Sequence, residues 1–290
     1  MRAEQIPVPI TLEELASRWR SRGRPPQPAV PWSRSSWLRQ FPEHAEFLSV
    51  LPEQIDRSTA TDYARHATTP NGAVQAFIVA MIWSHGPAGY GAYRTARVLR
   101  ENAAAAERLA EIARIARGSG GLAAFEHIAA NPLRYLGVAF GTKFLRFCTA
   151  VDGEDLTVPA LDAVVRRWLV IHTGIRLTID WWCVADYRSY LNVLAAWSTQ
   201  LELPPDTVEE LIFRTAVSDD GAALSGETWA AAGETVEPAD LRSTIAAAVQ
   251  VIEGTFAAMS GDAAARAEPH LRALRQLVFH DERPSYRPTG

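Results

Sequence analysis

Lysine is nearly absent from this chain of 290 residues, because Lys143 is the single lysine among 29 lysine and arginine residues. An arginine supplies charge but keeps its proton in proteins, whereas a desolvated lysine can act as a neutral amine nucleophile. Lys143 is therefore the first candidate for a catalytic residue. Codon bias is the alternative: it explains the rarity of lysine in a chain rich in alanine and arginine, but not why this one is present.

Cysteine and long apolar runs are also scarce. The two cysteines, Cys148 and Cys183, are too few for a disulfide framework, an iron-sulfur cluster or a structural zinc site. No apolar run is long enough to span a bilayer, and the N-terminus lacks the apolar segment of a signal peptide. We therefore expect two buried thiols, no membrane association and a cytoplasmic location.

Charge is unevenly distributed along a chain whose net charge is -4. Residues 201–240 contain ten acidic residues and one arginine, so the rest of the chain carries +5. Local positive charge is what a phosphate-binding surface requires, although solvated helix faces explain the pattern equally well. Five arginines lie near Lys143 in the sequence: Arg134, Arg146, Arg166, Arg167 and Arg176.

The hydrophobic pattern is helical nearly throughout. Apolar residues recur at intervals of three and four, as in residues 73–83 and 93–116, and no segment alternates like a strand. The sequence therefore predicts a mostly α fold. We divide the chain into an N-terminal extension rich in arginine, proline and tryptophan (1–40), a core (41–216), an acidic linker (217–238), and C-terminal helices with a tail (239–290).

Lys143 follows a segment rich in turn residues. Asn131-Pro132 opens this segment, which extends to Gly141, and an apolar helix is predicted from Thr142 to Ala150. A glycine-bearing turn that leads into a helix leaves backbone N–H groups free to bind an anion such as a DNA phosphate. Glycine before a helix is common, however, and a lysine near a helix start is more often an ordinary surface residue.

Asp162 stands where the next helix is expected to begin, just after Val158-Pro159. An aspartate at such a position usually caps the helix by accepting backbone hydrogen bonds. If the two helices pack side by side, Lys143 and Asp162 could share one cleft. An amine nucleophile would then be paired with a carboxylate that stabilises positive charge on a sugar. The spacing alone does not establish that they meet.

These motifs together resemble a known family. Gly141-Thr142-Lys143, followed by Val158-Pro159 and by Asp162 nineteen residues after the lysine, is similar to the 8-oxoguanine DNA glycosylase (OGG) type of the helix-hairpin-helix-GPD superfamily. The resemblance covers residues 41–216. It implies a two-lobed helical helix-hairpin-helix glycosylase fold, to which the C-terminal helices would be an appendage.

The resemblance also implies roles for individual residues. Lys143 matches the lysine that attacks the anomeric carbon of the target nucleotide and forms a Schiff base. Asp162 matches the aspartate that supports this attack. Ala139, Gly141 and Thr142 match the end of the hairpin that binds a backbone phosphate, although Ala139 stands where the family usually has a glycine. A further departure is that two residues, not one, separate Pro159 from Asp162.

A glycosylase must also move its target base out of the duplex, because an amine cannot reach the anomeric carbon inside the stack. The glycine-rich loop after Trp83 carries His85 and Tyr90, with Arg94 close behind, and we regard His85 and Tyr90 as candidate wedge residues. An ordinary loop with Trp83 in the core is an equal alternative. Phe147 lies one helical turn after Lys143 and is a candidate for stacking on the base, although a core position is favoured. Further pocket candidates, for which core packing is favoured, are Trp181 and Trp182.

The sequence therefore predicts a DNA glycosylase with abasic-site lyase activity. We expect an oxidised, 8-oxoguanine-like purine in double-stranded DNA as its substrate, a role in base excision repair and a nucleoid-associated location. No metal or organic cofactor is expected, because the lysine supplies the nucleophile. Two alternatives remain open: a glycosylase for another modified base, for example in phage DNA, and a non-catalytic helix-hairpin-helix protein that only binds nucleic acid.

Overall fold

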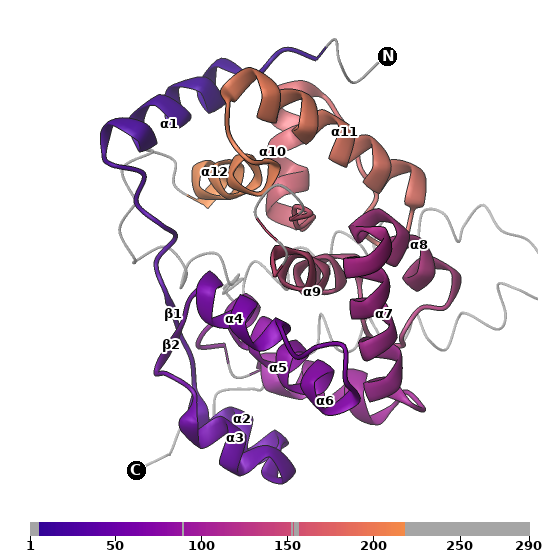
Figure 1. Ribbon diagram of the computed structural model, residues 1–290. Coiled ribbons are helices and arrows are strands. Elements are labelled where there is room, and N and C mark those ends of the chain that lie inside the picture. Colours follow the sequence, from indigo (N-terminus) through magenta and orange to yellow (C-terminus); the bar gives the residue numbers. More distant parts are fainter. Residues whose placement is uncertain (1–5, 89, 152, 154–156, 218–290) are drawn as a thin grey trace, which may run out of the picture. The chain divides into compact units, whose positions relative to one another are not determined.

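The computed structural model describes residues 6–88, 90–151, 153 and 157–217, and this part of the chain is mostly helical (Figure 1). The predicted C-terminal helices lie outside the described residues, and so does the predicted acidic linker apart from Val217, which ends α12. The helices are α1 (Ile10–Ser21), α2 (Arg34–Gln40), η2 (Pro42–His44), α3 (Ala45–Val50), α4 (Arg57–Ala64), α5 (Pro70–His85), α6 (Tyr90–Arg100), α7 (Ala105–Ser119), α8 (Gly121–Ala130), α9 (Val138–Ala150), α10 (Ala163–Thr173), α11 (Val184–Leu201) and α12 (Pro205–Val217). Two short strands, β1 (Val30–Pro31) and β2 (Gln54–Ile55), pair antiparallel.

Helices α4 to α9 form one packed group, which we call the α5 group. Helix α5 lies at its centre and contacts α4, α6, α7 and α9 (Figure 1). Its N-terminus has the expected signals, since Pro70 is the first helical residue and the Thr69 hydroxyl accepts the Gly72 N–H. Apolar side chains are buried around most of its surface, as expected for a helix surrounded by others.

Helices α10, α11, α12 and α1 form a second packed group, which we call the α12 group. Helix α12 contacts the other three. Residues 6–40, which the sequence analysis set apart as an extension, belong to the folded core in the described structure. Leu12 and Leu15 of α1 and Trp37 of α2 are buried.

The two groups adjoin through α8 and α9. Helix α8 packs on α7 and α9 within its own group and also on α11 of the other. Cys148 on α9 is buried, as expected, and burial raises the pKa of its thiol to about 12, which keeps it protonated and unreactive. Cys183 is half-buried rather than buried.

Candidate active site

Lys143 and Asp162 form an ion pair where the two helix groups adjoin. Lys143 lies on α9 of the α5 group, and Asp162 directly precedes α10 of the α12 group. Lys143 Nζ lies 3.0 Å from Asp162 Oδ2. The residues are only 8% and 6% exposed. The structure therefore brings together the two residues that the sequence singled out.

Asp162 uses its two carboxylate oxygens for different purposes. Oδ1 accepts the backbone N–H groups of Val164 and Val165, both at 3.0 Å, and thereby caps α10. Oδ2 remains for Lys143. The expected helix cap is confirmed, and it holds the carboxylate in one orientation. Its position at the N-terminus of α10 also stabilises the negative charge.

The segment that leads to Asp162 is held to α9 by two threonine hydroxyls. Thr142 Oγ1 accepts the Leu161 N–H at 3.0 Å, and Thr149 Oγ1 accepts the Val158 N–H at 3.0 Å. The two threonines are seven positions apart, which is about two helical turns, so they lie on one face of α9. Thr142 directly precedes Lys143, and Leu161 directly precedes Asp162. The hydrogen bond between Thr142 and Leu161 therefore holds the two catalytic candidates close to each other.

Two tyrosines of α11 hold the same segment from the other side. The Tyr187 hydroxyl donates to the carbonyl of Pro159 at 3.0 Å, and that of Tyr190 donates to the carbonyl of Ala160 at 2.6 Å. Burial raises the pKa of both tyrosines above the ordinary value, so they remain neutral donors. The sequence analysis missed these residues; their only sequence signal was a pair of tyrosines one helical turn apart.

The start of α9 differs from the prediction. The helix begins at Val138, not at Thr142, and the Gly141 N–H already bonds to the Gly137 carbonyl at 3.0 Å. The Gly141 amide is thus used inside the helix, and the buried Thr142 hydroxyl is bonded within the protein. Neither fits the predicted phosphate-binding turn. Of the three phosphate candidates, only Ala139 lies in the first helical turn, where backbone N–H groups lack partners in the helix.

Gly141 instead makes room for a tryptophan. A Cβ atom at this position would lie 2.2 Å from Cη2 of Trp182, so no larger residue fits without displacing the indole ring. Trp182 also packs on Phe125, with ring centroids 4.9 Å apart. Trp181, in contrast, is an exposed residue. Gly141 is therefore a packing glycine, not a turn glycine.

Two of the proposed pocket residues are core residues. Phe147 and Trp83 pack edge to face with centroids 5.1 Å apart, and both are buried. Phe147 has no exposed ring face for an incoming base, so the prediction that it stacks on the base is not supported. The interpretation of Trp83 and Phe147 as core residues, which the sequence analysis kept open, describes the structure better.

Two further wedge and pocket candidates, His85 and Arg94, lie against Phe140. The His85 ring stacks on Phe140 with centroids 4.5 Å apart, and the Arg94 guanidinium lies 5.1 Å from the same ring. Lys143 Nζ lies 5.9 Å from that ring as well. Burial, together with the positive charges of Lys143 and Arg94, lowers the pKa of His85 to about 4. His85 is thus a neutral, packed side chain, whereas Tyr90 is exposed and remains available as a wedge.

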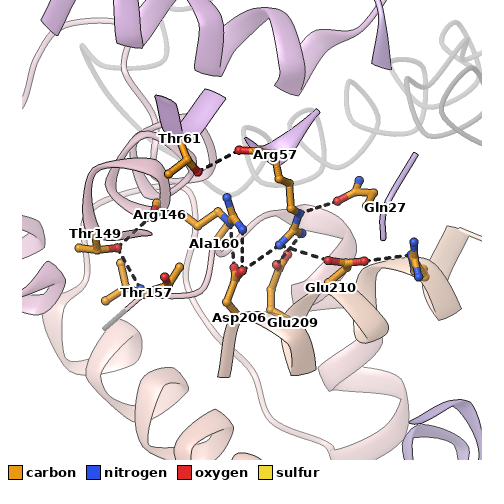
Figure 2. A network of polar contacts seen from close by, with 12 residues as sticks. Gln27, Arg57, Thr61, Arg146, Thr149, Thr157, Ala160, Asp206, Glu209 and Glu210 are labelled. Atoms are coloured by element: carbon orange, nitrogen blue, oxygen red, sulfur yellow. Dashed lines mark hydrogen bonds and ion pairs between the residues drawn. The ribbon is translucent and has the colours of Figure 1, made fainter. Parts of the chain in front are cut away.

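A second charged cluster, which we call the Arg57 cluster, joins the two helix groups (Figure 2). Asp206 of α12 accepts two hydrogen bonds from Arg146 of α9, one from Nε to Oδ1 at 2.8 Å and one from Nη2 to Oδ2 at 2.6 Å. Arg57 of α4 contacts Asp206, Glu209 and Glu210 at 3.1, 3.3 and 3.6 Å. Arg57, Arg146, Asp206 and Glu210 also line a cavity of about 590 Å³.

The carboxyl groups of the Arg57 cluster have divergent pKa values. Burial opposes ionisation of Asp206, but attraction by Arg146 and Arg57 outweighs it and lowers the pKa of Asp206 below its ordinary value. For Glu209, burial dominates. The pKa of Glu209 rises to about 8, because burial raises it and repulsion by Asp206 and Asp162 adds to this effect. The attraction of Arg57 acts in the opposite direction but is outweighed. The cluster therefore holds a protonated carboxyl group at neutral pH.

Among the described residues, no group of three or more histidine, cysteine, aspartate or glutamate side chains is placed to hold a metal ion. None of the helices described is both long and apolar enough to cross a membrane.

The described part of the chain is thus a helical protein in which a buried amine and a carboxylate meet between two helix groups. The chain belongs to the family described as "Putative 8-oxoguanine DNA glycosylase OGG-like protein", whose model matches residues 23–213. The match confirms the resemblance seen in the sequence and relates the protein to DNA glycosylases. It begins at residue 23 rather than at 41, in keeping with the buried residues contributed by that region. No curated protein and no solved structure matches the chain significantly.

Proposed function

We propose that the protein is a DNA glycosylase with abasic-site lyase activity, which excises an oxidised, 8-oxoguanine-like purine from double-stranded DNA. The observation that carries this proposal is the buried contact of 3.0 Å between Lys143 Nζ and Asp162 Oδ2. An amine can act as a nucleophile towards the anomeric carbon, and the adjacent carboxylate can stabilise the positive charge that develops on the sugar. The family match supports the choice of an oxidised purine.

The proposed reaction begins when Lys143 transfers a proton to Asp162 and becomes a neutral amine. Nζ then forms a bond to C1′ of the extruded nucleotide while the bond between C1′ and the base breaks, and the base departs with the bonding electrons and takes up a proton. Opening of the sugar ring converts the adduct into a Schiff base. Loss of a proton from C2′ expels the 3′ phosphate and cleaves the strand. Hydrolysis of the imine then restores Lys143.

The test is borohydride trapping on a duplex that carries a preformed abasic site, because this experiment does not require knowledge of the base. Borohydride reduces the Schiff base to a stable amine, so wild type should form a covalent adduct with DNA. Lys143→Gln and Lys143→Arg should form none while retaining much of the DNA binding. Arg114→Gln, a substitution at an exposed arginine of α7, is the matched control and should be trapped like wild type.

The substrate is tested separately, by incubation of wild type with duplexes that contain 8-oxoguanine, another modified base or only normal bases. Selective release of 8-oxoguanine is the expected result. Trapping without release of 8-oxoguanine would keep the lysine mechanism and reject the proposed substrate. Absence of an adduct with wild type, despite measurable DNA binding, would reject the lysine mechanism itself.

A further inference from the structure

Three exposed tyrosines lie together beside the start of α9. Tyr90 and Tyr93 are on α6 and are 65% and 43% exposed, and Tyr135, in the turn before α9, is 43% exposed. The rings of Tyr90 and Tyr93 have centroids 5.6 Å apart. Large apolar rings on a protein surface are costly to leave in water, and a group of them marks an interaction surface.

Arg97 connects these rings. Its guanidinium lies 3.7 Å from the ring centroid of Tyr135 and 5.9 Å from that of Tyr93. Glu101 holds it in place through an ion pair of 2.8 Å. Tyr93, Arg97 and Tyr135 thus form a preassembled stack, and together with Tyr90 we call it the tyrosine face.

The backbone holds Tyr135 in a conformation that is unfavourable for a residue with a side chain. Tyr135 has φ of +67°, in the left-handed region. The buried side chain of Asn102 fixes the preceding residue, because it accepts the Arg134 N–H at 2.8 Å and donates to the Arg134 carbonyl at 3.0 Å. The fold thus stabilises a strained turn that presents the ring to solvent. Such strain is characteristic of functional surfaces.

Positive charge borders the tyrosine face. Arg94 is exposed on α6, and Arg134 is exposed in the turn beside Tyr135. Arg94 also contacts the ring of Phe140, which Lys143 approaches to 5.9 Å, so the tyrosine face continues towards the candidate catalytic pair. Arginine beside exposed aromatic rings is the combination that binds nucleic acid strands, through phosphates and bases together.

We propose that the tyrosine face binds unpaired bases of DNA by stacking, so that the protein prefers DNA with an unpaired stretch over fully paired duplex. A paired base is covered on both faces by its neighbours and cannot offer a ring face to a tyrosine. An unpaired base can, and its flanking phosphates then reach the bordering arginines. The preference concerns where the protein binds, and thus extends beyond the proposed chemistry of Lys143.

The test is DNA binding by the full chain, measured by fluorescence anisotropy. Two labelled duplexes of the same length and top strand are compared, one fully paired and one with a central bubble of unpaired bases. Wild type should bind the bubble about tenfold more tightly, the effect expected from one or two stacked bases. Tyr93→Ala and Tyr135→Ala should lose most of this preference, whereas Tyr93→Phe and Tyr135→Phe should keep it because they retain the ring.

Ile10→Ala, which removes an exposed apolar side chain from α1, is the matched control and should leave the preference unchanged. Equal affinity of wild type for the two duplexes would overturn the proposal, as would alanine variants that are folded by circular dichroism and still prefer the bubble. Because binding needs no cleavage, a preference for the bubble together with failed borohydride trapping would reject the proposed reaction and retain the tyrosine face.

Discussion

At the scale of single residues, the catalytic candidates could be predicted from the sequence, but the residues that position them could not. Lys143 is marked by its rarity, and Asp162 by its place after Val158-Pro159. The hydroxyl groups of Thr142 and Tyr190 bond to backbone atoms of a segment distant in the sequence. Threonine and tyrosine are common in helices, so no local pattern indicates such partners.

The two functions of Asp162 can be separated by substitution. Asp162→Asn keeps an oxygen that can cap α10 but removes the negative charge. It should lower the rate of Schiff-base formation by about 100-fold or more, and it should lower stability because the buried Lys143 ammonium loses its partner. Asp162→Ala removes the cap as well and should be about 1 kcal/mol less stable than Asp162→Asn. Single-turnover trapping and urea unfolding measure the two effects. Equal destabilisation of the two variants would contradict the separation.

Thr142 offers a second prediction. Thr142→Val keeps the shape but leaves the buried Leu161 N–H without its acceptor, which should cost about 1–3 kcal/mol and lower the trapping rate by displacing Asp162. Thr142→Ser should restore both properties. Thr149→Val removes the equivalent bond to Val158, farther from Asp162, and should destabilise without a comparable loss of rate. If Thr149→Val slows trapping as much as Thr142→Val, the positioning role of Thr142 is refuted.

At the scale of secondary structure, the helical class was predictable and the boundaries near the site were not. The sequence predicts the start of the helix that carries Lys143 at Thr142, one turn too late, because Gly141 is interpreted there as a turn residue. Its actual role is to admit the ring of Trp182. A glycine needed for close packing and a glycine needed for a turn are identical in sequence; only the three-dimensional neighbour distinguishes them.

The Arg57 cluster tests how much the contacts among α4, α9 and α12 contribute to stability. Asp206→Asn removes the negative charge between Arg57 and Arg146 and leaves two buried guanidinium groups poorly compensated, so we expect a loss of about 3–5 kcal/mol in the free energy of unfolding. Asp62→Asn breaks the exposed pair with Arg65 and should cost less than about 1 kcal/mol. Urea unfolding followed by tryptophan fluorescence measures both. Similar losses for the two variants would contradict a structural role of the cluster.

At the scale of the whole molecule, the sequence identified the family but not the extent of the folded core. Residues 6–40 carry many arginines and prolines, a composition typical of an extension. They nevertheless contribute Leu12, Leu15 and Trp37 to the buried core. The helices that carry these side chains pack on helices far away in the sequence, because α1 packs on α12 and α2 packs on α6. Periodicity within a short segment cannot reveal such a partner.

The stability of the described core should depend on pH through Glu209. Its pKa is about 8 in the folded protein and its ordinary value is 4.5, so between these values the folded state keeps a proton that the unfolded state has released. This contribution to stability is complete below pH 4.5 and is lost as the pH rises to about 8. Glu209→Gln lacks the titration. Relative to wild type, its free energy of unfolding should therefore increase by on the order of 2 kcal/mol from pH 5 to pH 7. A difference between the two proteins that is independent of pH would contradict the assignment.

The buried charges that join the two helix groups have a consequence for how the molecule assembles. An interface of apolar side chains tolerates small shifts between the packed helices, because one apolar contact can replace another. The ion pairs of Lys143 with Asp162 and of Arg146 with Asp206 do not tolerate such shifts. Any other packing of the two groups would leave a buried charge without its partner. The amine therefore meets its carboxylate only when the two helix groups are correctly packed, so a misassembled molecule lacks the candidate catalytic pair.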